Sequence, residues 1–368
     1  MEYQLKNIFL KNKKNWWWIA LGSLAILVRI LLSGSPEVIE KYYAQGFFLG
    51  IRKVIDSTVG LLPFPLIYLF FLILIIFLIR KIRNLFRNHV SAKLTIVDIL
   101  FSLVTFFFGL VFFFLVLWGF NYGRLPLEQK LQIQPQPLSL TELKTELDLT
   151  HQEVVNARNQ IPNHTENPID ATFLPTDIEN EIRTIVKNEL HRMGDKTISD
   201  VRGRLLKPKG VLMRIGTSGV YFPWVGECNI DSGLHPVQIP FTLAHEFFHG
   251  YGFTDEGTCN FLAYLACIHS ENPVFQYSGY LGYWRYLASS YRRMDPENYK
   301  VYFEKIPKGV LNDIIAIDEE IDKYPDIFPD FRDAFYDTYL KTQGISEGMK
   351  NYSRIVMLAK AYRESNGN

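Results

Sequence analysis

The chain of 368 residues is long enough for one sizeable soluble domain together with membrane segments. Its 39 basic and 38 acidic side chains leave a formal charge of +1, which argues against a protein that binds nucleic acid or another polyanion through a basic surface. Aromatic residues make up 15% of the chain, and many of them lie in its N-terminal third.

Long apolar runs predict an all-α membrane region over residues 1–120. The runs cover about residues 16–32, 61–79 and 96–120, and each is long enough to cross a hydrocarbon core of roughly 30 Å. The first run could also be read as a cleaved signal peptide. Because Arg29 interrupts its end and no small-x-small cleavage site follows, an uncleaved anchor is favoured. The sequence therefore predicts three transmembrane helices.

Basic residues indicate how these helices are oriented. The N-terminus carries Lys6, Lys11, Lys13 and Lys14, and the link between the second and third runs carries Arg80, Lys81, Arg83, Arg87 and Lys93. Positive residues are retained in the cytoplasm. We therefore expect a multi-pass protein of the cytoplasmic (inner) membrane with its N-terminus inside and its C-terminal domain extracytoplasmic.

Residues 121–175 predict a linker followed by a scaffold helix. The linker is rich in Gln, Pro and Leu, and a capping box formed by Ser139 and Glu142 then opens a helix that runs to about Asn159. A second capping signal, Thr176 to Glu179, opens the next helix and begins the domain that we expect over residues 176–368.

The stretch 242–251 carries the sequence H-E-x-x-H through His245, Glu246 and His249. Residues four apart on a helix share a face, so both imidazoles can reach one metal ion. Glu246 lies next to the first ligand, where it can polarise a metal-bound water. The stretch holds no other charged residue, as expected for a buried active-site helix.

A third ligand should follow shortly after this motif. Gly250 and Gly252 can end the first helix, and Thr254 or Asp255 can cap a second helix that runs to about His269. Glu256 falls in the first turn of that second helix and is the ligand we favour. Asp255 is the alternative, although it is also well placed as an N-cap. Asn260, one turn further on, could hydrogen-bond a ligand imidazole from behind.

These residues carry a resemblance to known peptidases. The E-x-x-C-N of residues 256–260 resembles the E-x-x-A-D/N element that supplies the third zinc ligand in gluzincin-type membrane peptidases, the HtpX and CAAX-protease group. More closely, the chain resembles a bacterial family known only as a domain of unknown function, with membrane helices followed by a zincin-like domain. The matching segments are residues 218–223, 226–229, 240–246, 260–264, 277–280, 337–341 and Tyr352. The resemblance implies a mainly α, α+β zincin-like metallopeptidase domain over residues 176–368. Cys259 stands where the family usually has Ala.

Between residues 208 and 230 the pattern changes to β. Val211 to Ile215 and Val220 to Trp224 flank a turn with two glycines, which predicts a hairpin. In zincins the strand before the metal helix pairs with an extended peptide substrate. We assign that role to Val220–Trp224; a purely structural hairpin fits the pattern equally well.

Other polar residues have less specific patterns. Zinc peptidases often use a tyrosine or histidine to stabilise the oxyanion, and six tyrosines could serve, although packing is the expected role of each: Tyr277, Tyr280, Tyr283, Tyr286, Tyr339 and Tyr352. Tyr339 and Tyr352, which lie in the family-like segments, are the first to test. Glu227 and His235 flank the motif and are expected to be solvated or capping residues. The cysteines, Cys228, Cys259 and Cys267, show no metal-binding or disulfide spacing, so free buried thiols are expected.

The sequence thus predicts a membrane-anchored zinc metallopeptidase that acts on a protein or peptide substrate outside the membrane. Zn²⁺ would be held by His245, His249 and Glu256, and Glu246 would serve as the general base. The alternative is a non-catalytic zinc-binding envelope protein that functions in assembly or binding. Zinc-dependent hydrolysis of a non-peptide envelope substrate is a third possibility.

Overall fold

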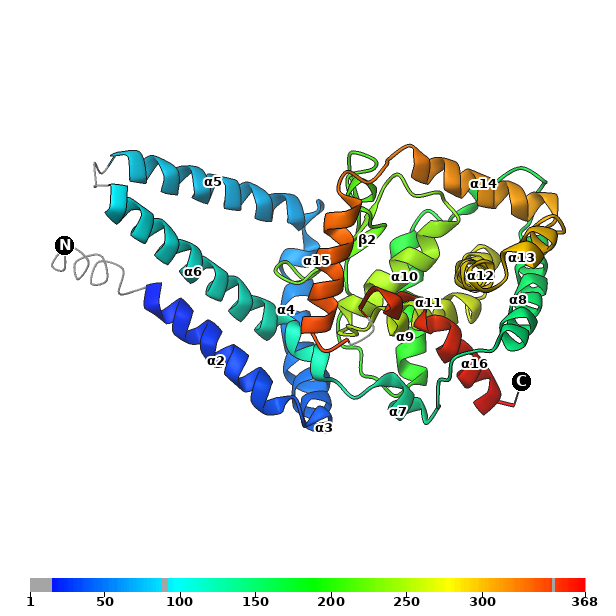
Figure 1. Cartoon of the computed structure of the whole chain (residues 1–368), viewed down its shortest axis with the longest axis horizontal. Helices are drawn as coiled ribbons and strands as arrows, with labels where there is room; N and C mark the ends of the chain where they lie inside the picture. Colours follow the sequence, from blue (N-terminus) through cyan, green and yellow to red (C-terminus); the bar gives the residue numbers. More distant parts are fainter. Residues whose placement is uncertain (1–14, 88–91, 346–347, 368) are drawn as a thin grey trace. The chain divides into compact units, whose positions relative to one another are not determined.

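The computed structural model describes residues 15–87, 92–345 and 348–367, so the N-terminal lysines at positions 6 to 14 lie outside the described residues. The protein is mostly helical with one small sheet, as the sequence predicts (Figure 1). It separates into two compact units. The N-terminal unit comprises Met1–Arg124 and Phe222–Gly226, and the C-terminal unit comprises Leu125–Tyr221 and Glu227–Asn368.

The N-terminal unit is built from helices. They are α2 (Trp16–Leu32), α3 (Pro36–Val38), η2 (Ile39–Phe47), α4 (Phe48–Asp56), η3 (Val59–Leu61), α5 (Leu66–Arg87), α6 (Ala92–Leu117) and η4 (Gly119–Gly123). Helices α2 and α6 pack along each other through apolar and aromatic side chains, such as Trp16 against Phe101 and Trp18 against Phe113.

Among the described residues, one helix is long and apolar enough to cross a membrane, namely Ile96–Leu117 within α6. Helix α2 meets the same test only together with Pro36–Asp56, from which it is bent by 119°. Helix α5 does not meet it, because the helix begins only at Leu66 and three basic residues, Arg80, Lys81 and Arg83, follow within its length. The structure therefore supports one or two of the three predicted spans.

A buried ion pair on α4 binds the loop at residues 222–226 within the N-terminal unit. Arg52 and Asp56 lie one turn apart on α4, and both side chains are buried. Arg52 Nη1 also donates to the carbonyl of Gly226 at 2.6 Å. Gly226 has a φ of +67° and an added Cβ would lie 2.7 Å from Arg52 Nη1, so only glycine fits here. Trp224 Nε1 donates to the Leu110 carbonyl at 3.2 Å and fixes the other side of the same turn.

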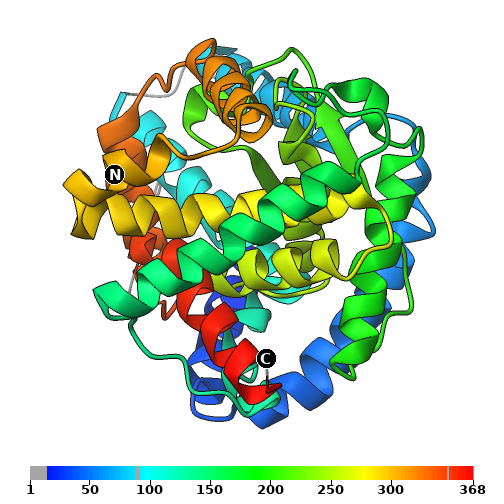
Figure 2. The ribbon, with the colours of Figure 1, turned by 90° about the vertical axis from the view of Figure 1, so that its right-hand side faces the viewer.

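The C-terminal unit is a helical assembly around a small sheet. Its helices are α7 (Leu127–Leu131), α8 (Leu140–Gln160), η5 (Ala171–Phe173), α9 (Ile178–Arg192), η6 (Met213–Ile215), α10 (Gln238–Gly250), α11 (Glu256–Ile268), α12 (Pro273–Met294), α13 (Pro296–Phe303), α14 (Lys308–Asp322), α15 (Pro329–Thr342), η7 (Gly348–Arg354) and α16 (Ile355–Ser365). Figure 2 shows α8 running beside α12, and the two helices pack closely. Helix α12 also packs against α10 and α11.

Local signals set several helix starts. The predicted capping box opens α8, because Ser139 Oγ accepts from the Glu142 N–H while Glu142 Oε2 accepts from the Ser139 N–H. Helix α9 is capped by Asp177, whose carboxylate accepts from Asn180 N, so the cap lies one residue beyond the predicted Thr176. Asp255 caps α11, one of the two residues that the sequence proposes.

The sheet has three strands in the order β1-β3-β2. Strands β1 (Gly203–Leu206) and β3 (Glu227–Asp231) are parallel, with Gly203 opposite Cys228. Strand β2 (Gly219–Phe222) lies at the other edge, so the predicted strand at Val220–Trp224 exists but is shorter and begins one residue earlier.

The predicted partner strand at Val211–Ile215 is wrong. The backbone N–H groups of Gly210 and Leu212 each donate to the buried Asp231 carboxylate at 2.7 Å, and Met213 N–H does so at 3.2 Å. Because these donors are used by one side chain, they cannot form a strand ladder, and the chain turns into η6 instead. The neighbour of β2 in the sheet is β3.

A buried polar network ties α8, α12 and α14 together. The Asp313 carboxylate is fully buried and accepts from Arg158 Nε, Tyr277 OH and Ile169 N, each at 2.7 Å. The remaining Arg158 nitrogens donate to the carbonyls of Thr165 and Asn167 at 2.8 Å. The Tyr277 hydroxyl is used by this buried network, so Tyr277 has the structural role that the sequence predicts.

We predict that Asp313→Ala destabilises the protein strongly, by about 3–5 kcal/mol, because Arg158 would be left buried without its counter-charge. Thermal unfolding of the full chain in detergent measures the change. The control is Asp318→Ala. Asp318 pairs with Arg285 at 3.2 Å but is 59% exposed, so its loss should cost less than about 1 kcal/mol. Equal losses in the two variants would contradict the assigned role of the network.

Candidate metal centre

Helix α10 brings the H-E-x-x-H residues into the interior of the C-terminal unit. Every residue from Leu243 to Gly250 is buried, and the helix packs on β3, α9, α11 and α12. His245 and His249 therefore lie one turn apart on a largely buried face, where 11% and 8% of their side-chain surfaces remain exposed. Cys228 on β3 donates its thiol to the Glu246 carbonyl at 2.9 Å, which helps to hold the helix against the sheet.

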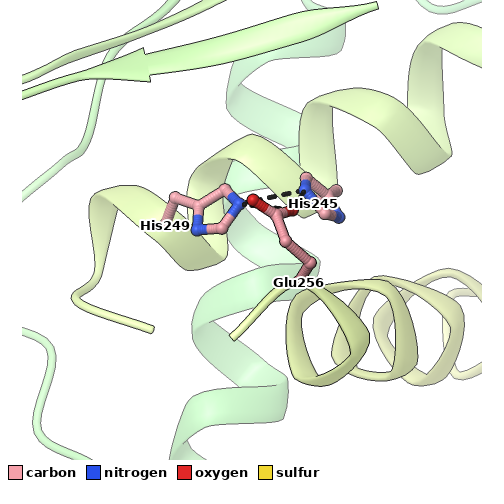
Figure 3. A group of neighbouring side chains, drawn as sticks. All are labelled: His245, His249 and Glu256. Atoms are coloured by element: carbon pink, nitrogen blue, oxygen red, sulfur yellow. Dashed lines mark hydrogen bonds and ion pairs between the residues drawn. The ribbon is translucent and has the colours of Figure 1, made fainter. Parts of the chain in front are cut away.

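The two imidazoles and the Glu256 carboxylate converge (Figure 3). The Nε2 atoms of His245 and His249 are 3.0 Å apart, and Glu256 Oε2 lies 3.2 Å from the first and 3.3 Å from the second. All three residues are buried. The structure thus brings together the three residues that the sequence proposes as metal ligands.

This geometry fits a zinc ion. A tetrahedral zinc with ligands at about 2.0–2.1 Å places its ligand atoms about 3.3–3.4 Å apart. The observed separations of 3.0–3.3 Å are close to that value. Two imidazole nitrogens and one carboxylate oxygen are also a donor set that zinc accepts, with a fourth position left for water.

Asp255 is used elsewhere. Its carboxylate accepts from Thr258 N at 2.7 Å as the N-cap of α11, and from Asn351 Nδ2 at 2.7 Å. Arg354 Nη1 adds a contact at 3.3 Å. These bonds fix the start of α11, whose first residue is Glu256. Between the two carboxylates proposed from the sequence, the structure therefore favours Glu256 as the ligand and gives Asp255 a positioning role.

Neighbouring groups orient the ligands. His249 Nδ1 lies 2.9 Å from the Phe253 carbonyl, which can only accept, so Nδ1 carries the proton and Nε2 is left for the metal. Glu256 Oε1 accepts from Tyr336 OH at 3.0 Å. Asn260 lies beside His245, as predicted, and its side chain is hydrogen-bonded to Tyr286.

Glu246 has the environment of a general base. Its carboxylate is buried, Oε2 has no hydrogen-bond partner among the residues that the structure describes, and the Tyr221 N–H bonds to the group from β2. Burial raises the pKa of Glu246 to about 8, with Glu256 adding to the shift and His249 and the Tyr221 N–H opposing it. An added Cβ on Gly219 would lie 2.5 Å from Glu246 Oε1, so β2 passes directly over this carboxylate.

The ligands are electrostatically coupled. Burial and the neighbouring His249 lower the pKa of His245. Although burial opposes it, Cys259 and Glu256 raise the pKa of His249 well above its usual value. Both histidines lower the pKa of Glu256 against the effect of burial. The pocket therefore stabilises one positive charge between the three side chains, which a metal ion can provide in place of a proton.

Other residues singled out from the sequence have structural roles. Tyr283 OH donates to Glu146 at 3.0 Å. Glu227 is buried and paired with Arg204 at 2.9 Å, so the expected solvated or capping role is wrong for it. His235 is also buried, and its carbonyl accepts from Gln238 N at the start of α10. The three cysteines are free and buried, as predicted.

Two tyrosines at the site were not assigned to it from the sequence. Tyr336 was missed, and Tyr286 was expected to have a packing role. Tyr339, one of the candidate oxyanion residues, packs beside Tyr336 with ring centroids 5.9 Å apart. The side chain of Tyr352 lies outside the described residues. Tyr336 follows Glu256 by 80 residues, and no spacing rule connects the two positions.

We predict that the protein binds one zinc ion and that Glu256→Gln weakens binding by more than the roughly 10–100-fold that loss of an outer-shell partner causes. Asp255→Asn is the matched control, since Asn also caps helices and the ligand is untouched, so its affinity should change by less than about 10-fold. Competition with a chromophoric chelator measures both. Greater weakening by Asp255→Asn would contradict the ligand assignment.

We also predict that zinc binding releases protons at neutral pH. The pKa of His249 is raised, so this imidazole is protonated below that pKa and the metal must displace the proton. Affinity should therefore fall as the pH falls, with about one proton released per zinc at about pH 7. Calorimetry in two buffers of different ionisation enthalpy measures the number. Zinc binding that releases no protons and does not vary with pH would contradict the coupled site.

Comparison with known proteins identifies a family but no activity. No curated protein and no solved structure matches the chain. The profile of the family described as "Protein of unknown function (DUF3810)" matches residues 43–359, which is most of the chain and includes the whole candidate metal centre. The protein is therefore a member of the DUF3810 family.

Proposed function

We propose that this protein is a membrane-anchored zinc metallopeptidase. The observation that carries the proposal is the convergence of His245 Nε2, His249 Nε2 and Glu256 Oε2 next to the buried carboxylate of Glu246. A binding site alone would not need an ionisable group beside the metal position. A buried carboxylate without a full set of hydrogen bonds costs free energy, so its presence favours a catalytic use.

The residues of the site can each take a separate role in hydrolysis. Zinc held by the two histidines and Glu256 would polarise a carbonyl group and lower the pKa of a water molecule. Glu246 accepts the proton of the attacking water and returns it to the leaving amine. Burial raises the pKa of Glu246 in the metal-free site. The charge of a bound zinc ion would lower this pKa again, so that the carboxylate is available as a proton acceptor.

The sheet edge supports a peptide as the substrate. Strand β2 lies at an edge of the sheet and passes over Glu246. An extended chain added along such an edge forms backbone hydrogen bonds that tolerate many sequences. If β2 only shields Glu246, the rate of hydrolysis should not depend on the length of the peptide.

The location that we propose is the cytoplasmic membrane, with the metal centre on its outer side. The apolar helix Ile96–Leu117 supports a membrane anchor, and the basic residues around position 80 to 93 support a cytoplasmic link between α5 and α6. With that orientation, the chain after α6 leaves the membrane on the extracytoplasmic side.

We predict that Glu246→Gln retains zinc while peptide hydrolysis falls by about 10²–10⁴-fold, because the proton acceptor is lost and the ligands are kept. Cleavage of a peptide library by the full chain, followed by mass spectrometry, measures the activity, and metal analysis measures zinc. Glu271→Gln, at an exposed position, is the control and should match the wild type.

Two outcomes would contradict the proposal. Equal hydrolysis by the wild type and Glu246→Gln would reject the mechanism. A wild type that binds zinc but neither cleaves peptides nor binds a hydroxamate would instead favour the alternative, a non-catalytic zinc-binding envelope protein for assembly or binding.

A further inference from the structure

Helix α15 is held in place with very little apolar packing. All its residues are described, and Leu340 is the only one that is buried. The rings of Phe331 and Phe335 stack on each other, yet they are 73% and 62% exposed. Burial of apolar surface therefore contributes little to the position of this helix, and its polar contacts must contribute much of what fixes it.

The polar contacts of α15 reach the rest of the unit at its start and at its middle. Near the start, Arg332 pairs with Asp326 and donates to the Gly216 carbonyl at 3.3 Å. At the middle, Tyr336 OH donates to Glu256 Oε1 at 3.0 Å. The second contact is made to a proposed metal ligand, so the helix contributes directly to the environment of the metal centre.

The two oxygens of Glu256 have different partners. Oε2 lies 3.2 and 3.3 Å from the histidine Nε2 atoms, in the position of a ligand atom. Oε1 is occupied by the phenol hydrogen of Tyr336. A hydrogen bond to a charged oxygen is strong and directional, so it fixes the rotation of the carboxylate and leaves Oε2 as the single ligand atom.

We propose that Tyr336 is a positioning residue that holds Glu256 as a one-oxygen ligand and so keeps one coordination position of the metal open. A carboxylate free to rotate can bind zinc through both oxygens and occupy the position that water or a substrate carbonyl needs. This inference rests on the metal centre of the proposed function, and it adds a residue of α15 to that centre.

The test compares Tyr336→Phe with Tyr339→Phe in the full chain. Both changes remove one hydroxyl from neighbouring rings of the same helix, and only the first removes a bond to Glu256. For Tyr336→Phe we expect zinc affinity to fall by about 10–100-fold, as for other partners of metal ligands. We also expect the visible absorption of the cobalt-substituted protein to weaken, because five-coordinate cobalt absorbs less than tetrahedral cobalt. Tyr339→Phe should change neither.

The other outcomes are decisive. An unchanged affinity and cobalt spectrum in Tyr336→Phe, or equal changes in both variants, would overturn the inference. If Tyr336→Phe does not fold, fluorotyrosine at position 336 keeps the ring and strengthens the donor, so it must preserve both zinc affinity and the tetrahedral spectrum. A wild type that binds no metal would reject the proposed function itself. If the wild type binds zinc and hydrolyses peptides but Tyr336→Phe changes neither zinc affinity nor the cobalt spectrum, only this inference is rejected.

Discussion

Three polar atoms meet in the interior of the C-terminal unit, and their arrangement could hold a metal ion. The Nε2 atoms of His245 and His249 and the Oε2 atom of Glu256 lie 3.0–3.3 Å from one another in a buried site. Two facing imidazole nitrogens repel unless a proton or a metal ion lies between them. A single cation satisfies all three atoms at once, whereas a proton can be shared by only two.

The surrounding elements hold these atoms in place. The Phe253 carbonyl orients His249, Asp255 fixes the start of α11, and Tyr336 fixes Glu256 from a helix 80 residues away. The buried network around Asp313 links α8, α12 and α14, and α12 packs against the two helices that carry the site, α10 and α11. Such support is what keeps metal ligands in productive geometry, because ligands with mobile partners lose affinity and activity.

Much of the site could be predicted from the sequence, because its ligands are close together in the chain. The helix period places His245 and His249 on one face, and the cap signal at Asp255 places Glu256 in the next turn. Contacts between residues far apart in the sequence leave no periodic pattern of this kind. The bonds from Tyr336 to Glu256 and from Asp231 to the loop at 210–213 are set by tertiary structure, so the first was missed and the second turned a predicted strand into a 3₁₀ turn.

X-ray absorption at the zinc edge of the full-length protein tests the central claim most directly. The metal centre predicts one zinc site with two imidazole nitrogens at about 2.0–2.1 Å and oxygen ligands at about 2.0–2.2 Å, with no sulfur. A sulfur shell at about 2.3 Å, or zinc without imidazole scattering, would place the metal elsewhere in the chain and contradict the account.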